Sequence, residues 1–279
     1  MGDHIPLLDR LRYALTKEDR TENFYRYQYE KFFSMLYSKE EDCLRLGPLR
    51  LPVLPGENHP TREDAYYAME IGDILFPAML GRFGYLDEGP YEWGGVHILE
   101  GDVVFDCGAN LGIFSLLAAY RGAEVYAFEP VPEARRLLRH TLDLNPELCE
   151  RVTIVPYALG AEKGEAEFTI LADTLVGSSM VLPQEGRKAK VAVTTVDAFV
   201  EETGLPCVDF LKADIEGAER LMLDGALATL AQCSPKVSIC MYHRPDDPEV
   251  IEGLLRSANP EYALVRKWKK IYGCVSVKK

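Results

Sequence analysis

Long hydrophobic runs are missing from this chain of 279 residues, although 47% of its residues are hydrophobic. No apolar stretch approaches the roughly 20 residues that a bilayer-spanning helix needs. The first residues carry acids and prolines in place of the basic and hydrophobic segments of a signal peptide. Cys-x-x-Cys pairs are also missing among the seven cysteines, several of which lie in apolar segments. We therefore expect a cytoplasmic protein whose cysteines are free, buried thiols.

Positive charge is scarce in this sequence. The 31 Lys and Arg residues stand against 44 Asp and Glu, which gives a formal net charge of −13 at pH 7. A surface of that sign repels nucleic acid and anionic membranes, so we expect neither as a partner. The length is large for one domain and small for two, which favours one catalytic domain with an appended segment.

The most informative segment is the run Val-Val-Phe-Asp-Cys-Gly-Ala-Asn-Leu-Gly at residues 103–112. Apolar residues lead into an acid, a tight glycine turn and an apolar helical stretch at 113–119. This order predicts a buried strand, a turn and a helix N-terminus, the arrangement that places a nucleotide at the end of a parallel strand. A second strand at 124–128 ends in Glu129, and an acid at this place can accept hydrogen bonds from both ribose hydroxyls.

A third glycine is missing from this turn, although a dinucleotide-binding loop needs Gly-x-Gly-x-x-Gly to approach a pyrophosphate. The spacing Asp-x-Gly-x-Asn-x-Gly instead resembles the first motif of class I S-adenosylmethionine (SAM) methyltransferases. In that family the acid would lie near the aminoacyl end of SAM, whose ammonium group it suits. A glycine-rich turn without a ligand is the alternative. The resemblance implies a SAM-binding set of Asp106, Gly108, Ala109, Asn110, Gly112, Glu129 and Pro130.

Strand and helix patterns alternate through the rest of the chain. The expected core strands are 102–106, 124–128, 152–155, 210–213 and 237–241, with helices at 113–120 and 132–144. An inserted strand pair is expected at 164–170 and 188–195. Two closing strands follow between 262 and 277, around a basic stretch at 266–270 that we interpret as a solvated hairpin turn. The pattern predicts an α/β fold with a doubly wound, Rossmann-like, seven-stranded and mostly parallel sheet.

Four segments together are similar to the FkbM family of SAM-dependent methyltransferases. They are residues 106–112, 128–130, 158–165 and the run Val-Asp-Phe-Leu-Lys-Ala-Asp-Ile-Glu-Gly-Ala-Glu at 208–219. The resemblance covers residues 91–279; Ala213 and Ile215 depart mildly from the usual pattern. It implies a class I methyltransferase fold, SAM as the cofactor and methylation of hydroxyl groups on natural products or sugars.

Residues 1–60 lie outside this resemblance. Leu and Phe recur at near-helical spacing over residues 1–46, and residues 24–29 are unusually aromatic. Four prolines interrupt regular structure between 47 and 60. We therefore expect a helical extension and linker at 1–60, acting as a substrate lid or in a homodimer, and a methyltransferase domain at 61–279. Thr61 is expected to cap the first helix of that domain.

Two further loops contain candidates for cofactor contacts. Glu92 lies in the loop before the first core strand, a place where methyltransferases often touch the methionine end of SAM; a simple surface loop is the alternative. Tyr157 and Ala158 follow the third core strand, at the edge of the sheet where adenine is expected. Their alternative is an ordinary loop after a strand.

Asp214 and His243 are the catalytic candidates. Asp214 follows the fourth core strand and is expected to bind a substrate hydroxyl, the SAM ammonium group or a divalent cation. His243 follows the fifth strand and would face the same crevice, where histidine is a common general base. The SAM sulfonium is already activated, so the enzyme must align the nucleophile and remove its proton. Tyr242 and Arg244 are weaker candidates for substrate contacts, and a structural loop role is the alternative for His243.

A metal site is possible but not favoured at this stage. The acids that could bind magnesium are Asp214, Glu216, Asp246 and Asp247. A helix N-terminus accounts for Glu216 and Glu219 without a ligand, and no His/Cys cluster has zinc spacing. We therefore expect activity to survive chelation.

The sequence predicts a SAM-dependent methyltransferase acting on a hydroxyl of a small molecule. The alternatives are a non-catalytic SAM-binding or scaffold protein, and methylation of nitrogen or carbon. A nicotinamide oxidoreductase is disfavoured, because neither Gly-x-Gly-x-x-Gly nor a Tyr-x-x-x-Lys pair is found.

Overall fold

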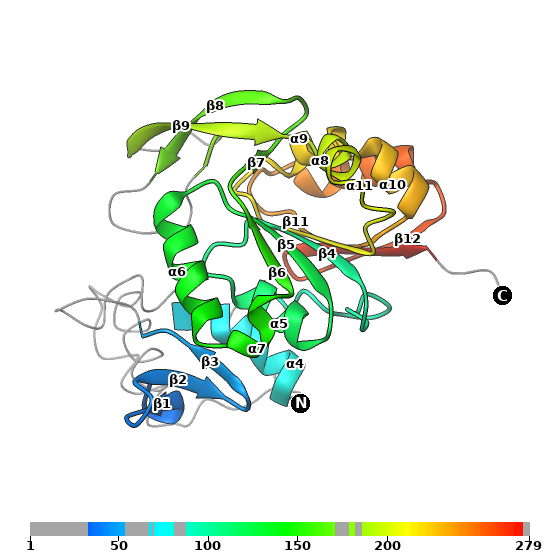
Figure 1. Cartoon of the computed structure of the whole chain (residues 1–279). Helices are drawn as coiled ribbons and strands as arrows, with labels where there is room; N and C mark the ends of the chain where they lie inside the picture. Colours follow the sequence, from blue (N-terminus) through cyan, green and yellow to red (C-terminus); the bar gives the residue numbers. More distant parts are fainter. Residues whose placement is uncertain are drawn as a thin grey trace, which may run out of the picture.

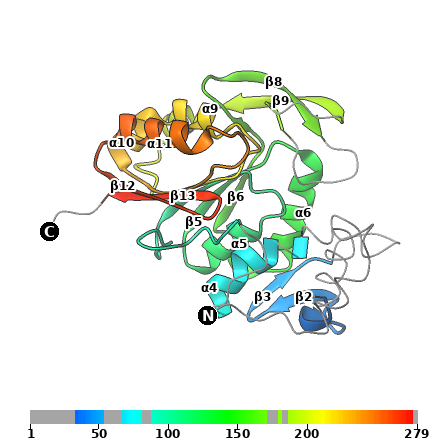
Figure 2. The same ribbon diagram turned by 180° about the vertical axis from the view of Figure 1, so that it is seen from behind.

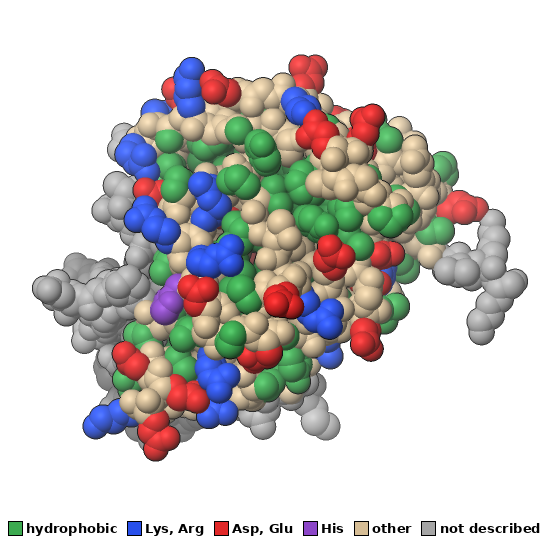
Figure 3. All heavy atoms as spheres, in the orientation of Figure 1, with side chains coloured by type: hydrophobic (Ala, Val, Ile, Leu, Met, Phe, Trp, Pro, Cys, Tyr) green, Lys and Arg blue, Asp and Glu red, His purple; other side chains and the backbone are tan. Residues whose placement is uncertain are grey.

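The computed structural model describes residues 33–53, 67–68, 70–80, 88–170, 179–181 and 186–275. A central sheet lies between two groups of helices, with a smaller sheet at each end of the molecule (Figure 1). Within the described residues, no helix is both long and apolar enough to cross a membrane. On the face shown in Figure 3, basic side chains lie among acidic ones, so the net negative charge is mixed with positive groups there.

The central sheet has seven strands in the order β12-β13-β11-β10-β4-β5-β6. Only β13 runs opposite to the other six strands. The expectation of a mostly parallel, Rossmann-like sheet is therefore confirmed. The five expected core strands agree with the structure to within one residue. The strands are β4 (Val103–Cys107), β5 (Glu124–Phe128), β6 (Val152–Val155), β10 (Phe210–Ala213), β11 (Lys236–Cys240), β12 (Tyr262–Lys267) and β13 (Lys270–Val275).

Helices cover both faces of this sheet because successive strand residues point to opposite sides. Val104 packs in the core on one face and its neighbour Phe105 in the core on the other. Figure 2 shows the two helix groups from behind. The first group comprises η1 (Ile71–Leu75), α4 (Phe76–Leu80), α5 (Ile113–Tyr120), α6 (Pro132–Asp143) and α7 (Pro146–Cys149). The second comprises α8 (Val196–Thr203), α9 (Glu219–Asp224), α10 (Leu227–Cys233) and α11 (Asp247–Ala258).

The inserted strand pair is confirmed and forms a separate small sheet. β8 (Gly164–Ile170) pairs antiparallel with β9 (Arg187–Thr194), and the short β7 (Ala158–Leu159) pairs with β9 on its other edge. The small sheet is inserted in the sequence between β6 and α8.

The described part of the N-terminal segment departs from the helical expectation. Residues 37–51 form three antiparallel strands, β1 (Tyr37–Ser38), β2 (Cys43–Leu46) and β3 (Leu49–Leu51), so the helix expected through residue 46 and the irregular linker after it are wrong there. Apolar residues alternate around Gly47, whose left-handed φ of +61° forms the turn. Leu44 and Leu51 join the core of the first sheet face. The aromatic segment 24–29 and Thr61 lie outside the described residues.

Two expectations about individual side chains are also wrong. Cys207 and Cys233 form a disulfide, whereas the sequence analysis assigned free thiols throughout; the other five cysteines are free. The cytoplasmic location therefore loses its support from the cysteines and stays a prediction. Lys270 is 1% exposed instead of solvated, because its Nζ donates to the carbonyl oxygens of Glu88 at 2.9 Å and Gly89 at 2.8 Å.

Asn145 joins the N-terminal strands to the main core. Its Oδ1 accepts from Arg50 N at 2.9 Å, and its Nδ2 donates to Arg50 O at 2.6 Å and Thr141 O at 2.7 Å. We predict that Asn145→Ala lowers the free energy of unfolding by about 2–4 kcal/mol, because it leaves both Arg50 backbone groups unpaired. Urea denaturation measures this. Glu150→Ala, an exposed change beside α7, should stay within about 0.5 kcal/mol of wild type; equal stability of the two variants would contradict the role of Asn145.

Candidate functional site

The candidate site lies at the carboxyl ends of β4 and β10, where the strand order reverses. The chain continues from β4 outward to β5 and β6, and from β10 outward to β11, so these two neighbours form the topological switch point. Ligands of open α/β sheets bind in the crevice at this point. The loop at 108–112 and Asp214 meet there. A Cβ on Gly108, which has a left-handed φ of +82°, would lie 2.0 Å from Asp214 O, so only glycine allows this approach.

Four of the five backbone amides of the glycine loop (residues 108–112) have acceptors in the protein. Gly108 N and Ala109 N both donate to Phe128 O at 3.0 Å, and Asn110 N donates to Glu129 Oε2 at 3.0 Å. A phosphate-binding loop needs such amides free to cradle the anion. The structure therefore agrees with the missing third glycine in disfavouring a dinucleotide.

Glu129 is held beside this loop in the orientation expected of a ribose ligand. Its side chain accepts from Val131 N at 2.7 Å through Oε1 and from Asn110 N through Oε2. A carboxylate has about four lone-pair positions, so both oxygens can accept further hydrogen bonds. Burial raises the pKa of Glu129 to about 7, against the opposing effect of the two backbone hydrogen bonds. Its contact with a ribose stays a prediction.

Asp106 forms a buried ion pair instead of facing the crevice. It is fully buried, with Oδ1 2.9 Å from Lys212 Nζ and Oδ2 accepting from Ser115 Oγ at 2.6 Å. Lys212 Nζ also donates to Gly108 O at 2.6 Å. Burial lowers the pKa of Lys212, but the charges of Asp106 and Asp214 outweigh this effect and raise it. Asp106 therefore positions Lys212 and the loop, and its expected contact with the SAM ammonium group is not supported.

Glu70 is a site residue that the sequence analysis missed. It directly precedes η1, and its Oε1 accepts from Asn110 Nδ2 at 3.1 Å. Burial raises the pKa of Glu70 to about 7, against the opposing charge of Lys212. Asn110 has a positive φ of 48°, and its buried Oδ1 has no hydrogen-bond partner among the described residues. No sequence pattern marks Glu70, because packing of η1 on α5 brings it to the loop.

Asp214 lies in the crevice as expected, and Tyr91 holds it there. Tyr91 OH donates to Asp214 Oδ2 at 2.7 Å, and Lys270 Nζ lies 4.4 Å from the centre of the Tyr91 ring. Burial raises the pKa of Asp214, but the charges of Lys212, His243 and Lys270 outweigh this effect and lower it below its usual range. Asp214 is thus an ionised hydrogen-bond acceptor in the crevice.

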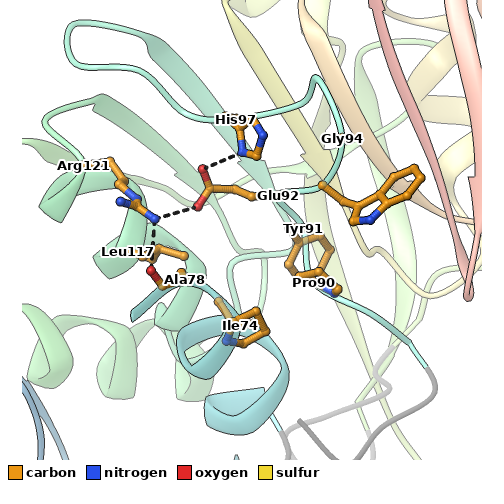
Figure 4. A pocket seen from close by; sticks show the side chains of 11 residues that line it. Ile74, Ala78, Pro90, Tyr91, Glu92, Gly94, His97, Leu117 and Arg121 are labelled. Carbon is orange, nitrogen blue, oxygen red and sulfur yellow. Dashed lines mark hydrogen bonds and ion pairs between the residues drawn. The ribbon is translucent and has the colours of Figure 1, made fainter. Parts of the chain in front are cut away.

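Glu92, in the loop before β4, binds groups away from the glycine loop. Glu92 accepts from Ile98 N at 3.0 Å and lies 3.6 Å from Arg121, at the end of α5 opposite the glycine loop. It lines a cavity of about 260 Å³ together with Tyr91 (Figure 4). The hydroxyl of Tyr91 reaches Asp214. A contact of Glu92 with the methionine end of SAM stays a prediction.

His243 lies beside Asp214 as expected, and three carboxylates surround its ring. Its side chain is 4% exposed, with Nδ1 3.2 Å from Glu219 Oε1 and Nε2 3.3 Å from Glu216 Oε2 and 3.7 Å from Asp214 Oδ1. Burial lowers its pKa, but Glu216 and Glu219 outweigh burial and raise the pKa of His243 to about 11. A protonated imidazole accepts no proton, so the general-base role requires the neutral form of His243 and stays a prediction.

The neighbours of His243 divide into two groups. Tyr242 is 38% exposed, and its OH lies 3.5 Å from Asp214 Oδ1, so it remains a candidate for a substrate contact. Asp246 and Asp247 form ion pairs with Arg220 at 2.5–2.6 Å. These two acids are therefore engaged elsewhere and are not ligands of a metal in the crevice. Arg244 N donates to Asp247, which fixes the same turn.

The remaining expected cofactor contacts lie near the ends of β5 and β6. Pro130 O accepts from Arg135 Nη1 at 2.7 Å. Tyr157 is 39% exposed after β6, whereas Ala158 is 5% exposed within β7 and packs in the small sheet's core. Contacts of these residues with adenine or ribose stay predictions. Gly112 has a φ of +82° and begins α5 in close contact with α6.

The model of the methyltransferase FkbM domain matches residues 106–262, more than half of the chain. The chain belongs to the FkbM family. A 31-O-demethyl-FK506 methyltransferase from Streptomyces tacrolimicus is 30% identical over 47% of this chain and 62% of its own length. A hexuronic acid methyltransferase from Haloferax volcanii is 29% identical over 57% of this chain and 63% of its own length. The matches thus cover less than two thirds of either relative.

A solved FkbM methyltransferase from Methylobacillus flagellatus shares the fold, with a TM-score of 0.51 at 22% identity. The match covers 67% of this chain and 48% of that one. In this FkbM-family chain, the matched region contains the glycine loop, Glu129, Asp214 and His243. Glu70 and Tyr91 lie before it, so the site also depends on residues outside the family match.

The ion pair of Asp106 and Lys212 gives a test of how this FkbM-family site is held. We predict that Lys212→Met lowers the free energy of unfolding by about 3–5 kcal/mol, because Asp106 is left as an unpaired buried charge. The double variant Asp106→Asn with Lys212→Met should cost less than the sum of the two single changes. Urea denaturation of all four proteins measures the coupling; additive losses would contradict the pairing.

Proposed function

We propose that the protein is a SAM-dependent methyltransferase that transfers a methyl group to a hydroxyl of a small molecule. The observation that carries this proposal is the Glu129 carboxylate beside a glycine loop whose amides are already engaged. This arrangement suits a nucleoside ribose and lacks the free amides that a pyrophosphate requires. Membership of the FkbM family supports the same conclusion.

The residues around the glycine loop fit SAM in charge and in hydrogen-bonding capacity. Glu129 would accept from the ribose hydroxyls, and the unpaired Oδ1 of Asn110 is a buried acceptor at the same place. Glu70 and Asp214 supply negative charge for the ammonium group of the methionine part. When bound, SAM would supply an activated methyl group on its sulfonium.

The acceptor is proposed to bind beside Asp214 and Tyr242. Asp214 is ionised, so it can accept a hydrogen bond from an acceptor hydroxyl and orient its oxygen. Tyr242 is exposed at the same opening and offers a phenolic donor. The names of the two relatives give 31-O-demethyl-FK506 and a hexuronic acid as their substrates, which supports a small-molecule acceptor. Methylation of nitrogen or carbon and a non-catalytic SAM-binding role are the alternatives.

The cofactor proposal predicts the effect of removing Glu129. Glu129→Ala should weaken binding of S-adenosylhomocysteine by about 10- to 150-fold, a loss of roughly 1.5–3 kcal/mol, because a charged acceptor of the ribose disappears. Isothermal titration calorimetry measures this, and NAD serves as the comparison ligand that should not bind. Glu124→Ala, an exposed change at the start of β5, should leave the affinity unchanged.

The pH dependence of the same binding reaction is a second check. Glu129 has a pKa of about 7 in the free protein, and ribose hydroxyls bind the ionised form better. Affinity should therefore fall about five- to tenfold from about pH 8 to about pH 6, and less steeply in Glu129→Gln. Binding of NAD in place of S-adenosylhomocysteine, or unchanged affinity in Glu129→Ala, would contradict the cofactor proposal.

Methyl transfer itself is tested with labelled SAM and a panel of sugars, uronic acids and polyketides. We expect label to appear on a hydroxyl oxygen, identified by mass spectrometry and NMR of the product. Asp214→Asn should lower turnover by about 10²–10⁴-fold, because the acceptor hydroxyl loses an ionised partner. The exposed Asp224→Asn is the matched control. A methylated nitrogen or carbon, or wild-type turnover in Asp214→Asn, would overturn the assignment.

A further inference from the structure

Negative charge is in excess around His243. Carboxylate oxygens of Asp214, Glu216 and Glu219 all lie within 4 Å of its ring nitrogens. The two nearest lysines have other partners: Lys212 pairs with Asp106, and Lys270 donates to two backbone carbonyls. The ring of His243 therefore faces three buried or half-buried acids. Such a group of nitrogen and oxygen ligands suits a cation in the crevice.

The two nitrogens of His243 have different surroundings. Nδ1 lies 3.2 Å from Oε1 of Glu219, which is fully buried and also accepts from Ile215 N at 2.9 Å. A carboxylate beside one ring nitrogen is the arrangement that orients metal-binding histidines and leaves the other nitrogen available as a ligand. Nε2 is the free nitrogen here, and it faces Glu216 and Asp214.

The atoms around Nε2 lie close to the spacing of ligands around one metal ion. Glu216 Oε2 lies 3.3 Å and Asp214 Oδ1 3.7 Å from Nε2, and the three ligand atoms all lie within 4.8 Å of one another. Ligands at about 2.1 Å from a metal are about 3.0–3.4 Å apart in octahedral or tetrahedral geometry. Neither nitrogen of His243 makes a hydrogen bond of good geometry, although the side chain is only 4% exposed. A buried imidazole without such a bond is an independent sign of a ligand.

The backbone and a neighbouring side chain hold these ligands in place. Glu216 has a left-handed φ of 53°, a conformation that non-glycine residues adopt rarely and often at functional sites. Tyr91 donates to Oδ2 of Asp214, and Oδ1 faces both Nε2 of His243 and the OH of Tyr242, which lies 3.5 Å away. The alternative trio of Glu219, His243 and Asp247 is already satisfied, because Asp247 binds Arg220 and Arg244 N.

We propose that Asp214 Oδ1, Glu216 Oε2 and His243 Nε2 bind one divalent transition-metal cation. A set of one imidazole and two carboxylates suits Mn²⁺, Fe²⁺ or Zn²⁺ better than Mg²⁺, which prefers oxygen ligands alone. This proposal replaces the expectation of a metal-free site, which considered only acids and included Asp246 and Asp247. The cation lies beside the proposed acceptor position, where it would polarise a bound hydroxyl.

Titration with Mn²⁺ alone tests the site. The full chain is treated with EDTA and dialysed, and free Mn²⁺ is then followed by electron paramagnetic resonance. We expect one Mn²⁺ per chain, and affinity at least about tenfold weaker in Glu216→Gln and His243→Ala. Asp246→Asn is the matched acidic control and should bind like wild type, because Asp246 pairs with Arg220 outside the site.

Glu219→Gln provides a test that spares the three ligands. It should weaken Mn²⁺ binding by about 10- to 100-fold, because the partner that orients His243 loses its charge. Circular dichroism checks folding; if His243→Ala fails to fold, Glu216→Gln and Glu219→Gln decide. Absence of stoichiometric Mn²⁺ binding to wild type, or wild-type affinity in Glu216→Gln, would overturn the proposal. The titration contains neither SAM nor the acceptor. Its outcome, for or against the metal site, therefore does not decide the separate test of methyl transfer.

Discussion

The buried ion pair between Asp106 and Lys212 is the constraint on which the site depends. It joins the two strands that flank the topological switch point, and Lys212 extends the link to the carbonyl of Gly108. The glycine loop can then turn so closely past Asp214 that a Cβ would not fit. A charge pair in a fully buried position is costly unless its geometry is well satisfied. Here Ser115 and the loop carbonyl supply the remaining hydrogen bonds.

Two regions of different electrostatic character meet at this ion pair. On the side of β5, buried Glu129 and half-buried Glu70 lie beside the glycine loop, and desolvation brings the pKa of both into the neutral range. On the side of β11, Asp214 and Glu216 face His243 and give a compact group of oxygen and nitrogen ligands. The first region suits the hydroxyl and ammonium donors of a nucleoside cofactor, and the second suits a cation and an acceptor hydroxyl.

Segments upstream of the family match complete the crevice. Tyr91 reaches Asp214 from the loop before β4, and the C-terminal hairpin holds that loop through Lys270 and its contacts with Glu88 and Gly89. Glu70 arrives from the helical segment that packs on α5. Part of the site therefore comes from residues that precede the matched region.

The sequence by itself determined the alternation of strands and helices, the glycine loop and the places of Glu129, Asp214 and His243 along the chain. These are local features, because strand periodicity and glycine spacing are written in neighbouring residues. Only the tertiary structure decided what each acid faces. Asp106 is paired with Lys212. Glu92 accepts from Ile98 N, whereas its neighbour Tyr91 donates to Asp214. His243 is surrounded by carboxylates from another segment, and its protonation depends on contacts that no local pattern records.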